Sequence, residues 1–355
     1  MQVFCRVATL LTALAATATA GPPPAKVKQC QLGALGPNVS CIAYGTLHMH
    51  EAGTCAGPRG SCPTQTAAAL AMIERALDAG ITTFDLASNY NDMPQLFGAA
   101  VRSKPGLREK IQVIAKMDCA GGNKEFGFGF DSGSTYDTSL EYMEKNLQIY
   151  LDSLNTTYVD VLMFHRQDYI MEVDEIATYF AKLKQEGKAR YFGASNFDRP
   201  SFELLASRLQ EHGIPLIANE IEISPITPAA IHDGTVAYHY STKTGILAWS
   251  AVGGDPWGNQ NRLFMVGSLD GTPHNARIHA GLGDVAKNLS TAANPVGQDV
   301  VALAWLLRHP AQIIPIIGTM NPTRLMQQAA AGAVAEQMTT AMWYHIADAV
   351  GVPIP

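Results

Sequence analysis

Gly80-Ile-Thr-Thr-Phe-Asp85-Leu-Ala-Ser-Asn-Tyr90 follows a helical pattern, begins as a short apolar strand and ends in ionisable side chains. The preceding helix is predicted over residues 66–79, where apolar residues recur at helical spacing, and Gly80 is a typical stop signal. Residues 81–85 then predict a short strand because the run is brief and apolar. A helix followed at once by a strand is the repeating unit of an α/β fold.

The same alternation continues along the chain in both directions from this segment. Further helices are predicted over residues 94–103, 139–154, 173–186, 200–212 and 298–309, and further strands over 111–116, 159–165, 189–195, 217–220, 245–249 and 313–318. At this length and number of units, a closed (β/α)₈ TIM barrel is the leading solution. Residues 251–297 are interpreted as a long loop that either covers the substrate or is an irregular surface insertion.

Composition excludes some function classes and suggests a processed N-terminus. The 355 residues carry 25 Lys plus Arg against 31 Asp plus Glu, and a net charge of −6 gives no basic surface for nucleic acid. Ala18-Thr19-Ala20 before Gly21 has the small-x-small form of a signal-peptidase site, so residues 1–20 are interpreted as a signal peptide. The expected location is the secretory pathway or outside the cell, with an organelle or the cytoplasm as alternatives. No later apolar run is long enough to span a membrane.

The cysteines outside residues 1–20 leave two interpretations open. They are Cys30, Cys41, Cys55, Cys62 and Cys119, an odd number that leaves at least one thiol unpaired within the chain. Residues 27–46 predict a β-hairpin around Gly36-Pro37-Asn38, and pairing Leu32 with Val39 would set Cys30 opposite Cys41. A disulfide can form there, and a second between Cys55 and Cys62. Reduced, buried cysteines are the alternative.

Three ionisable residues stand at the carboxyl ends of consecutive predicted strands: Asp85, Lys116 and His165. These ends converge in a barrel and form its usual active-site face, and Tyr90 lies in the loop just beyond the first of them. A tyrosine hydroxyl with a pKa of about 10 needs a neighbour to work near neutral pH. We expect Lys116 to lower that pKa, Asp85 to orient Lys116, and His165 to hold a substrate carbonyl. Each residue alone is more typical of local packing or capping.

Several motifs extend this pattern to a known family. The segment from Gly80 to Tyr90, with Asp and Tyr five residues apart, resembles the aldo-keto reductase motif, and it is followed in family order by Ile114-Ala-Lys116, Val161-Leu-Met-Phe-His165, Gly187-Lys-Ala-Arg-Tyr-Phe-Gly-Ala-Ser-Asn-Phe197, Ala248-Trp-Ser250 and Pro315-Ile-Ile-Gly-Thr319. The resemblance covers residues 27–354. It implies a (β/α)₈ TIM barrel with an N-terminal β-hairpin closing the barrel bottom, and reduction of an aldehyde or ketone with Tyr90 as general acid, assisted by Lys116, Asp85 and His165.

The resemblance also implies a nicotinamide cofactor, with NADP(H) favoured over NAD(H). The implied cofactor-binding residues are Gly45, Thr46, Asp85, Ser195, Asn196, Glu220, Trp249, Ser250, Gly318, Thr319, Arg324 and Gln328. Trp249 would stack on the nicotinamide, since an indole offers a large flat apolar surface. Arg324 suits a 2′-phosphate, which a guanidinium can bind through two parallel hydrogen bonds.

Two positions depart from the family pattern. Gly318 stands where many members place a lysine against the 2′-phosphate, which weakens the inference of NADP(H). Glu220 stands where a glutamine usually bonds the nicotinamide carboxamide, and an ionised glutamate can accept but not donate. The charge of Glu220 leads to the hypothesis that the site favours the oxidised, positively charged nicotinamide.

Other functions are weighed against a reductase. The barrel could instead bind the cofactor as a regulatory or redox-sensing module with little turnover. A carboxylate hydrolase using Asp85 and Glu220 would leave Tyr90 and Lys116 unexplained. The run His48-Met-His50-Glu51 could ligate a metal in principle, but adjacent residues at one strand end more often face different ways, so no metal is assigned. The expected partner is a small carbonyl compound. Neither nucleic acid nor, after removal of the leader, a membrane is expected as a partner. The sequence does not define the oligomeric state.

Overall fold

A computed structural model describes residues 26–51, 63–90, 92–121, 135–254, 263 and 272–354. Residues 1–20, interpreted above as a signal peptide, lie outside this range, as do Cys55 and Cys62 with their suggested disulfide. None of the described helices is long and apolar enough to cross a membrane.

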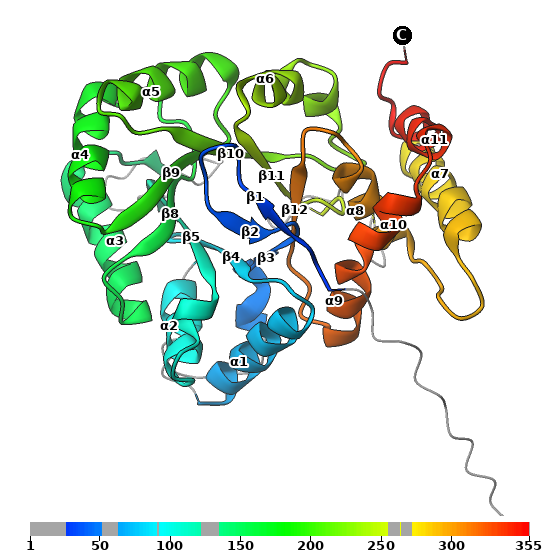
Figure 1. The fold of residues 1–355 in the computed structure, drawn as a ribbon, viewed down its shortest axis with the longest axis horizontal. Coiled ribbons are helices and arrows are strands. Elements are labelled where there is room, and N and C mark those ends of the chain that lie inside the picture. The colour runs from blue at the N-terminus through cyan, green and yellow to red at the C-terminus, as the bar shows by residue number, and fades with distance from the viewer. Residues whose placement is uncertain are drawn as a thin grey trace, which may run out of the picture.

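Eight parallel strands close into a barrel, which confirms the predicted fold class (Figure 1). In sequence order they are β3 (Ala43–Gly45), β4 (Thr83–Ala87), β5 (Gln112–Met117), β8 (Val159–Phe164), β9 (Ala189–Ser195), β10 (Leu216–Glu222), β11 (Gly245–Trp249) and β12 (Ile313–Ile317). Strand β12 pairs with β3 through Ile316 with Ala43 and Ile317 with Tyr44, which completes the ring. Each strand therefore has two neighbours, and all carboxyl ends point to one face.

Helices surround the barrel between successive strands (Figure 1). They are α1 (Pro63–Asp78), α2 (Met93–Arg102), α3 (Leu140–Leu154), α4 (Val173–Gln185), α5 (Arg199–Glu211), α6 (Thr235–Thr242) and α8 (Gln298–Leu307), with α9 (Pro322–Ala329) and α10 (Ala331–Gln337) after β12. Helix α3 shows how sequence sets the bounds: Ser139 caps its first turn, and Asn155 ends it in the left-handed conformation with φ 49°. Its buried Tyr150 donates to the carbonyl of Lys116 at 2.7 Å, so this helix helps to fix the strand that carries Lys116.

An N-terminal hairpin closes the bottom of the barrel. Strands β1 (Gln29–Gln31) and β2 (Asn38–Ser40) lie across the bottom of the barrel in Figure 1. The amide of Ala34 donates to the carbonyl of Lys243, just before β11, at 2.8 Å. An apolar cluster fills the space above the hairpin. Its buried members are Leu32, Val39, Ala43, Ile114, Val161, Met163, Ile217, Ala218, Leu247, Ile314 and Ile316. Gly33 takes φ +66°, and a side chain there would meet the carbonyl oxygen of Ile217, so only glycine fits this plug.

The predicted hairpin register was wrong by two residues. Cys30 pairs with Val39 rather than Cys41, because the amide of Leu32 donates to the carbonyl of Pro37 and shortens the turn. Cys30 and Cys41 are nevertheless joined by a disulfide, with Cα atoms 5.4 Å apart as diagonal neighbours. Cys119 is a free, buried thiol.

The interpretation of residues 251–297 as a loop was also wrong in part, because they include helix α7 (Pro273–Leu289). Thr272 caps the helix, and Ile278, Leu282 and Val285 form a buried face at helical spacing. Helix α7 lies beside α11 (Thr340–Val350), as Figure 1 shows at the edge of the barrel. Gly, Asn and Pro flank this helix and obscure its pattern. A separate two-stranded sheet forms where β6 (Cys119–Gly121) pairs with β7 (Thr135–Tyr136).

Candidate active site

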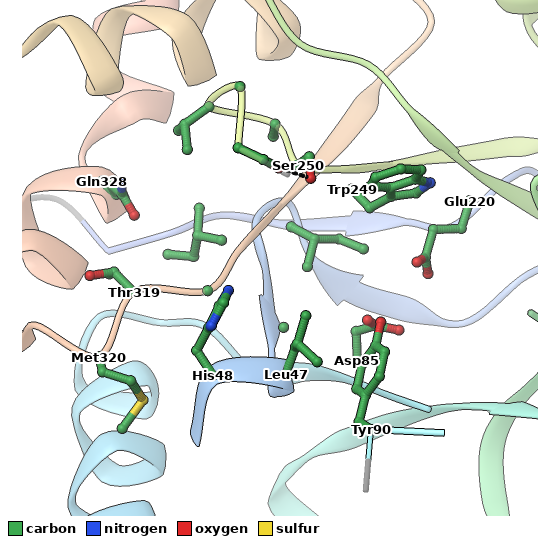
Figure 2. Close-up of a pocket in the computed structure, with 18 of the residues that line it drawn as sticks. Leu47, His48, Asp85, Tyr90, Glu220, Trp249, Ser250, Thr319, Met320 and Gln328 are labelled. Atoms are coloured by element: carbon green, nitrogen blue, oxygen red, sulfur yellow. Dashed lines mark hydrogen bonds between the residues drawn. The ribbon is translucent and has the colours of Figure 1, made fainter. Parts of the chain in front are cut away.

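A cavity of about 410 Å³ lies at the carboxyl ends of the strands. It is lined by Gly45, Leu47, His48, Asp85, Tyr90, His165, Arg166, Asn196, Glu220, Trp249, Ser250, Ala251, Val252, Gly253, Gly254, Ile316, Ile317, Gly318, Thr319, Met320, Arg324 and Gln328. Asp85, Tyr90 and Glu220 lie toward one end in Figure 2, and Thr319 and Gln328 toward the other. The volume is that of a ligand pocket.

Beneath the cavity, Lys116 is held between two carboxylates. Its Nζ lies 2.7 Å from both Asp85 oxygens and 2.6 Å from Glu220 Oε1. The exposed fractions of the Lys116, Asp85 and Glu220 side chains are 0%, 4% and 2%, so water screens none of these charges effectively. Strands β5 and β10 are not neighbours in the barrel, so Lys116 and Glu220 meet across its interior.

The three charges shift one another's protonation. Burial and the charge of Glu220 raise the pKa of Asp85 to about 8, against the opposing effect of Lys116. Burial alone would lower the pKa of Lys116, but Asp85 and Glu220 together raise it well above its ordinary value. Lys116 therefore stays charged at neutral pH, whereas Asp85 is largely protonated there.

Tyr90 projects into the cavity from the turn after β4, and Figure 2 shows its ring beside Asp85. Lys116 Nζ lies 5.5 Å from the centre of the Tyr90 ring, and the His165 ring meets it edge-on with centroids 5.7 Å apart. Lys116 lowers the pKa of Tyr90, as expected, but the net shift of that pKa is upward. Burial raises that pKa above its ordinary value by more than Lys116 lowers it, and Asp85 and Glu220 raise it further. The hydroxyl thus keeps its proton and can donate it.

His165 is neutral at this site. Burial lowers its pKa well below the ordinary value, and the charges of Lys116 and Arg166 act in the same direction. Its Nδ1 is buried without a hydrogen-bond partner among the described residues. The backbone at His165 is fixed from two sides: its amide donates to Asp118 Oδ1 at 3.3 Å, and its carbonyl accepts from Asn196 at 3.0 Å. A neutral, positioned imidazole can hydrogen-bond a carbonyl oxygen.

Trp249 forms one wall of the cavity, and its indole is fixed in place. Its Nε1 donates to Asn196 Oδ1 at 2.9 Å, and the Arg166 guanidinium lies 5.5 Å from the ring centre. Ser195 lies behind this wall, fully buried, and donates to the carbonyl of Glu220 at 2.9 Å. A fixed indole gives the flat apolar surface that stacking on an aromatic ligand requires.

The far end of the cavity is built by the start of α9. Arg324 lies in the first turn of this helix, where Asn321 caps the amides of Thr323 and Arg324. Gln328, one turn further on, donates to Asp299 at 3.0 Å, while its Oε1 has no partner among the described residues. A guanidinium beside a helix N-terminus is a favourable environment for an anion.

The predicted site residues line the cavity with three exceptions. Thr46 and Ser195 are fully buried and do not line the cavity, and Thr46 instead donates to the carbonyl of Asp85 at 2.9 Å. Both therefore support residues that do line it. Lys116 also lies below the wall, where its ion pairs place it.

Sequence reasoning missed two residues that shape the site. Arg166 lines the cavity next to His165, and Asp118 is buried with φ 88° and accepts from the amides of His165 and Arg166. A cation directly after a strand-end His was the available signal for Arg166. Asp118 comes two residues after Lys116, but only the fold shows that its carboxyl faces His165. Within the described residues, no cluster of three or more His, Cys, Asp or Glu is placed to hold a metal ion.

Comparisons with known proteins agree with this geometry. The model of the aldo/keto reductase family matches residues 41–350. An uncharacterised oxidoreductase, YcsN of Bacillus subtilis, is 33% identical over 81% of this chain and 89% of its own length. A 6-dehydroglucose reductase of Agrobacterium fabrum is 31% identical over 80% of this chain and 88% of its own length. The crystal structure of the thermostable aldo-keto reductase Tm1743 has a TM-score of 0.69 at 19% identity, covering 91% of this chain and all of that one, which shows a shared fold.

Proposed function

Because the chain belongs to the aldo/keto reductase family, we propose that it reduces an aldehyde or ketone to an alcohol with NADPH, using Tyr90 as the general acid. The observation that carries the proposal is the meeting of a protonated Tyr90 and a neutral His165 in one cavity above the buried Lys116. These groups can donate a proton and a hydrogen bond to the same carbonyl oxygen. The oxidoreductase names of relatives accord with this class of chemistry.

The residues that line the cavity suit a nicotinamide dinucleotide chemically. Trp249 offers a fixed aromatic face near Tyr90, and Arg324 offers a cation at the far end. The unpartnered Glu220 Oε2 and Gln328 Oε1 are acceptors for a ligand's amino groups. Bound NADPH would supply the hydride. The chain's own residues would hold the nicotinamide against Trp249, the 2′-phosphate at Arg324 and the carbonyl oxygen at His165 and Tyr90.

Cofactor binding and turnover test the proposal together. We expect NADPH to quench tryptophan fluorescence saturably, since Trp249 lines the cavity, and to be consumed when aldehydes are added. The panel should include a hexose carrying an aldehyde at C6, because a relative is named for reducing 6-dehydroglucose. Tight binding without consumption on any carbonyl would favour a cofactor-binding regulatory barrel. Absence of binding would refute both functions.

Arg324→Ala is expected to weaken NADPH binding by about 10- to 100-fold while leaving NADH binding nearly unchanged. Hydrogen bonds to a charged group contribute roughly 1.5–3 kcal/mol, and only NADPH carries the 2′-phosphate. Fluorescence titration of wild type and variant with both cofactors measures the effect, with NADH as the matched control. Equal losses for both cofactors would show that Arg324 acts on the shared part of the molecule or on the fold of α9.

A further inference from the structure

We propose that Glu220 makes this site bind the oxidised, cationic nicotinamide more tightly than the neutral reduced form. The inference rests on the proposed function, because it needs a nicotinamide lying against Trp249. It gives a physical consequence of having Glu220 where the family usually has a glutamine. Three features of the structure support it: an uncompensated charge, its direction, and the lack of another cation to neutralise it.

The first feature is the charge balance below the cavity. The Lys116 ammonium pairs with two carboxylates, Asp85 at 2.7 Å and Glu220 at 2.6 Å. All three side chains are at most 4% exposed. Once Asp85 is ionised, above its pKa of about 8, Lys116 balances only one of the two carboxylates and the cluster carries one net negative charge. In a region of low dielectric constant such a charge acts strongly on a neighbouring ligand.

The second feature is the direction in which this charge faces. Glu220 lines the cavity, whereas Lys116 does not. Glu220 Oε1 contacts Lys116, but the buried Oε2 has no hydrogen-bond partner among the described residues. Figure 2 shows the Glu220 carboxylate between Trp249 and Asp85, at the end of the cavity where a stacked nicotinamide would lie. An unpartnered, buried carboxylate oxygen at this place is suited to a cationic ring.

The third feature is the surroundings of Glu220. Among the described residues, Lys116 is the only cation within 4.0 Å of its carboxylate. His165 is neutral, and the Arg166 guanidinium lies over Trp249 instead. The charge of Glu220 therefore stabilises a positive charge on a neighbouring ligand. It would assist carbonyl reduction, in which positive charge builds on the nicotinamide, and would slow release of the oxidised cofactor.

The test is the ratio of dissociation constants for NADPH and NADP⁺, measured by calorimetry without substrate. At pH 8.5, above the pKa of about 8 of Asp85, we expect wild type to bind NADP⁺ the more tightly. Glu220→Gln keeps the shape of the side chain and removes its charge, so the ratio should fall by about tenfold or more. Glu220→Asp keeps the charge and should retain the preference for NADP⁺ at least in part.

Glu222→Gln is the matched control on the same strand. Glu222 lies outside the cavity wall and accepts from Thr227 at 3.0 Å, a bond that a glutamine oxygen can also accept. The ratio of dissociation constants for NADPH and NADP⁺ should be the same in Glu222→Gln as in wild type. The inference is overturned if Glu220→Gln binds both cofactors with an unchanged ratio. If wild type binds neither cofactor, the proposed function fails and this inference with it, so the two failures are distinguishable.

Discussion

Tyr90→Phe is expected to lower kcat for carbonyl reduction by about 10²- to 10⁴-fold, the usual contribution of a general acid. The substitution removes only the hydroxyl and leaves an aromatic ring that can still contact His165 and the Lys116 ammonium. Affinity for NADPH should therefore stay close to that of wild type. Steady-state consumption of NADPH, combined with fluorescence titration of the cofactor, separates the lost proton donor from lost binding.

Tyr179→Phe is the control for this prediction. Tyr179 is buried in α4, away from the cavity wall, and its hydroxyl has no hydrogen-bond partner among the described residues. Removal of that hydroxyl should leave kcat unchanged. A loss of less than about tenfold in Tyr90→Phe would mean that His165 or water supplies the proton, and the assignment of Tyr90 as the general acid would then be abandoned.

Lys116→Met is expected to lower the free energy of unfolding at pH 8 by about 3–5 kcal/mol, because removing one partner leaves uncompensated buried charge. Asp85 and Glu220 would face each other across the space that the ammonium now fills. Urea denaturation measures the loss. The control is Lys104→Met, which breaks an ion pair with Glu74 whose side chains are 49% and 42% exposed, and should cost less than about 1 kcal/mol.

The effect of Lys116→Met should depend on pH in a defined direction. The folded-state pKa of Asp85 is already about 8 with Lys116 present, above the value of about 3.9 in an unfolded chain. A carboxyl group with a raised folded-state pKa favours the fold below its unfolded value, and that stability is lost as pH rises through the folded value. Loss of Lys116 raises the pKa further. Asp85 therefore adds nothing to the difference between wild type and variant from about pH 4 to pH 8, and it widens that difference as pH rises above about 8, where Asp85 ionises in folded wild type but stays protonated in the variant.

A triple variant distinguishes this explanation from poor packing of methionine. Asp85→Asn and Glu220→Gln, added to Lys116→Met, remove all three charges and should recover much of the lost stability. Failure to recover would show that the stem of Lys116, rather than its charge, stabilises this part of the barrel. Equal stability of Lys116→Met and wild type at pH 8 would contradict the ion-pair account altogether.

Local patterns in the sequence predicted most of the strands and helices of the barrel. Predicted strands such as 189–195 and 245–249 coincide with the observed ones because short apolar runs between helices have few other solutions. Helix α7 was missed because its buried face is interrupted by polar and glycine residues and packs on α11, far along the chain. The hairpin register was missed because the turn length depends on the bond from Leu32 to Pro37.

The sequence by itself determined the alternation of strands and helices and the residue types at the strand ends, including Asp85, Lys116 and His165. These follow from local periodicity and from the rule that carboxyl ends of barrel strands converge. Only the tertiary structure decided that Glu220, 104 residues after Lys116, shares its ammonium with Asp85, and that Asp118 holds the backbone of His165. Such contacts depend on barrel closure and on which side chains face inward, and the resulting burial sets the charge of the site.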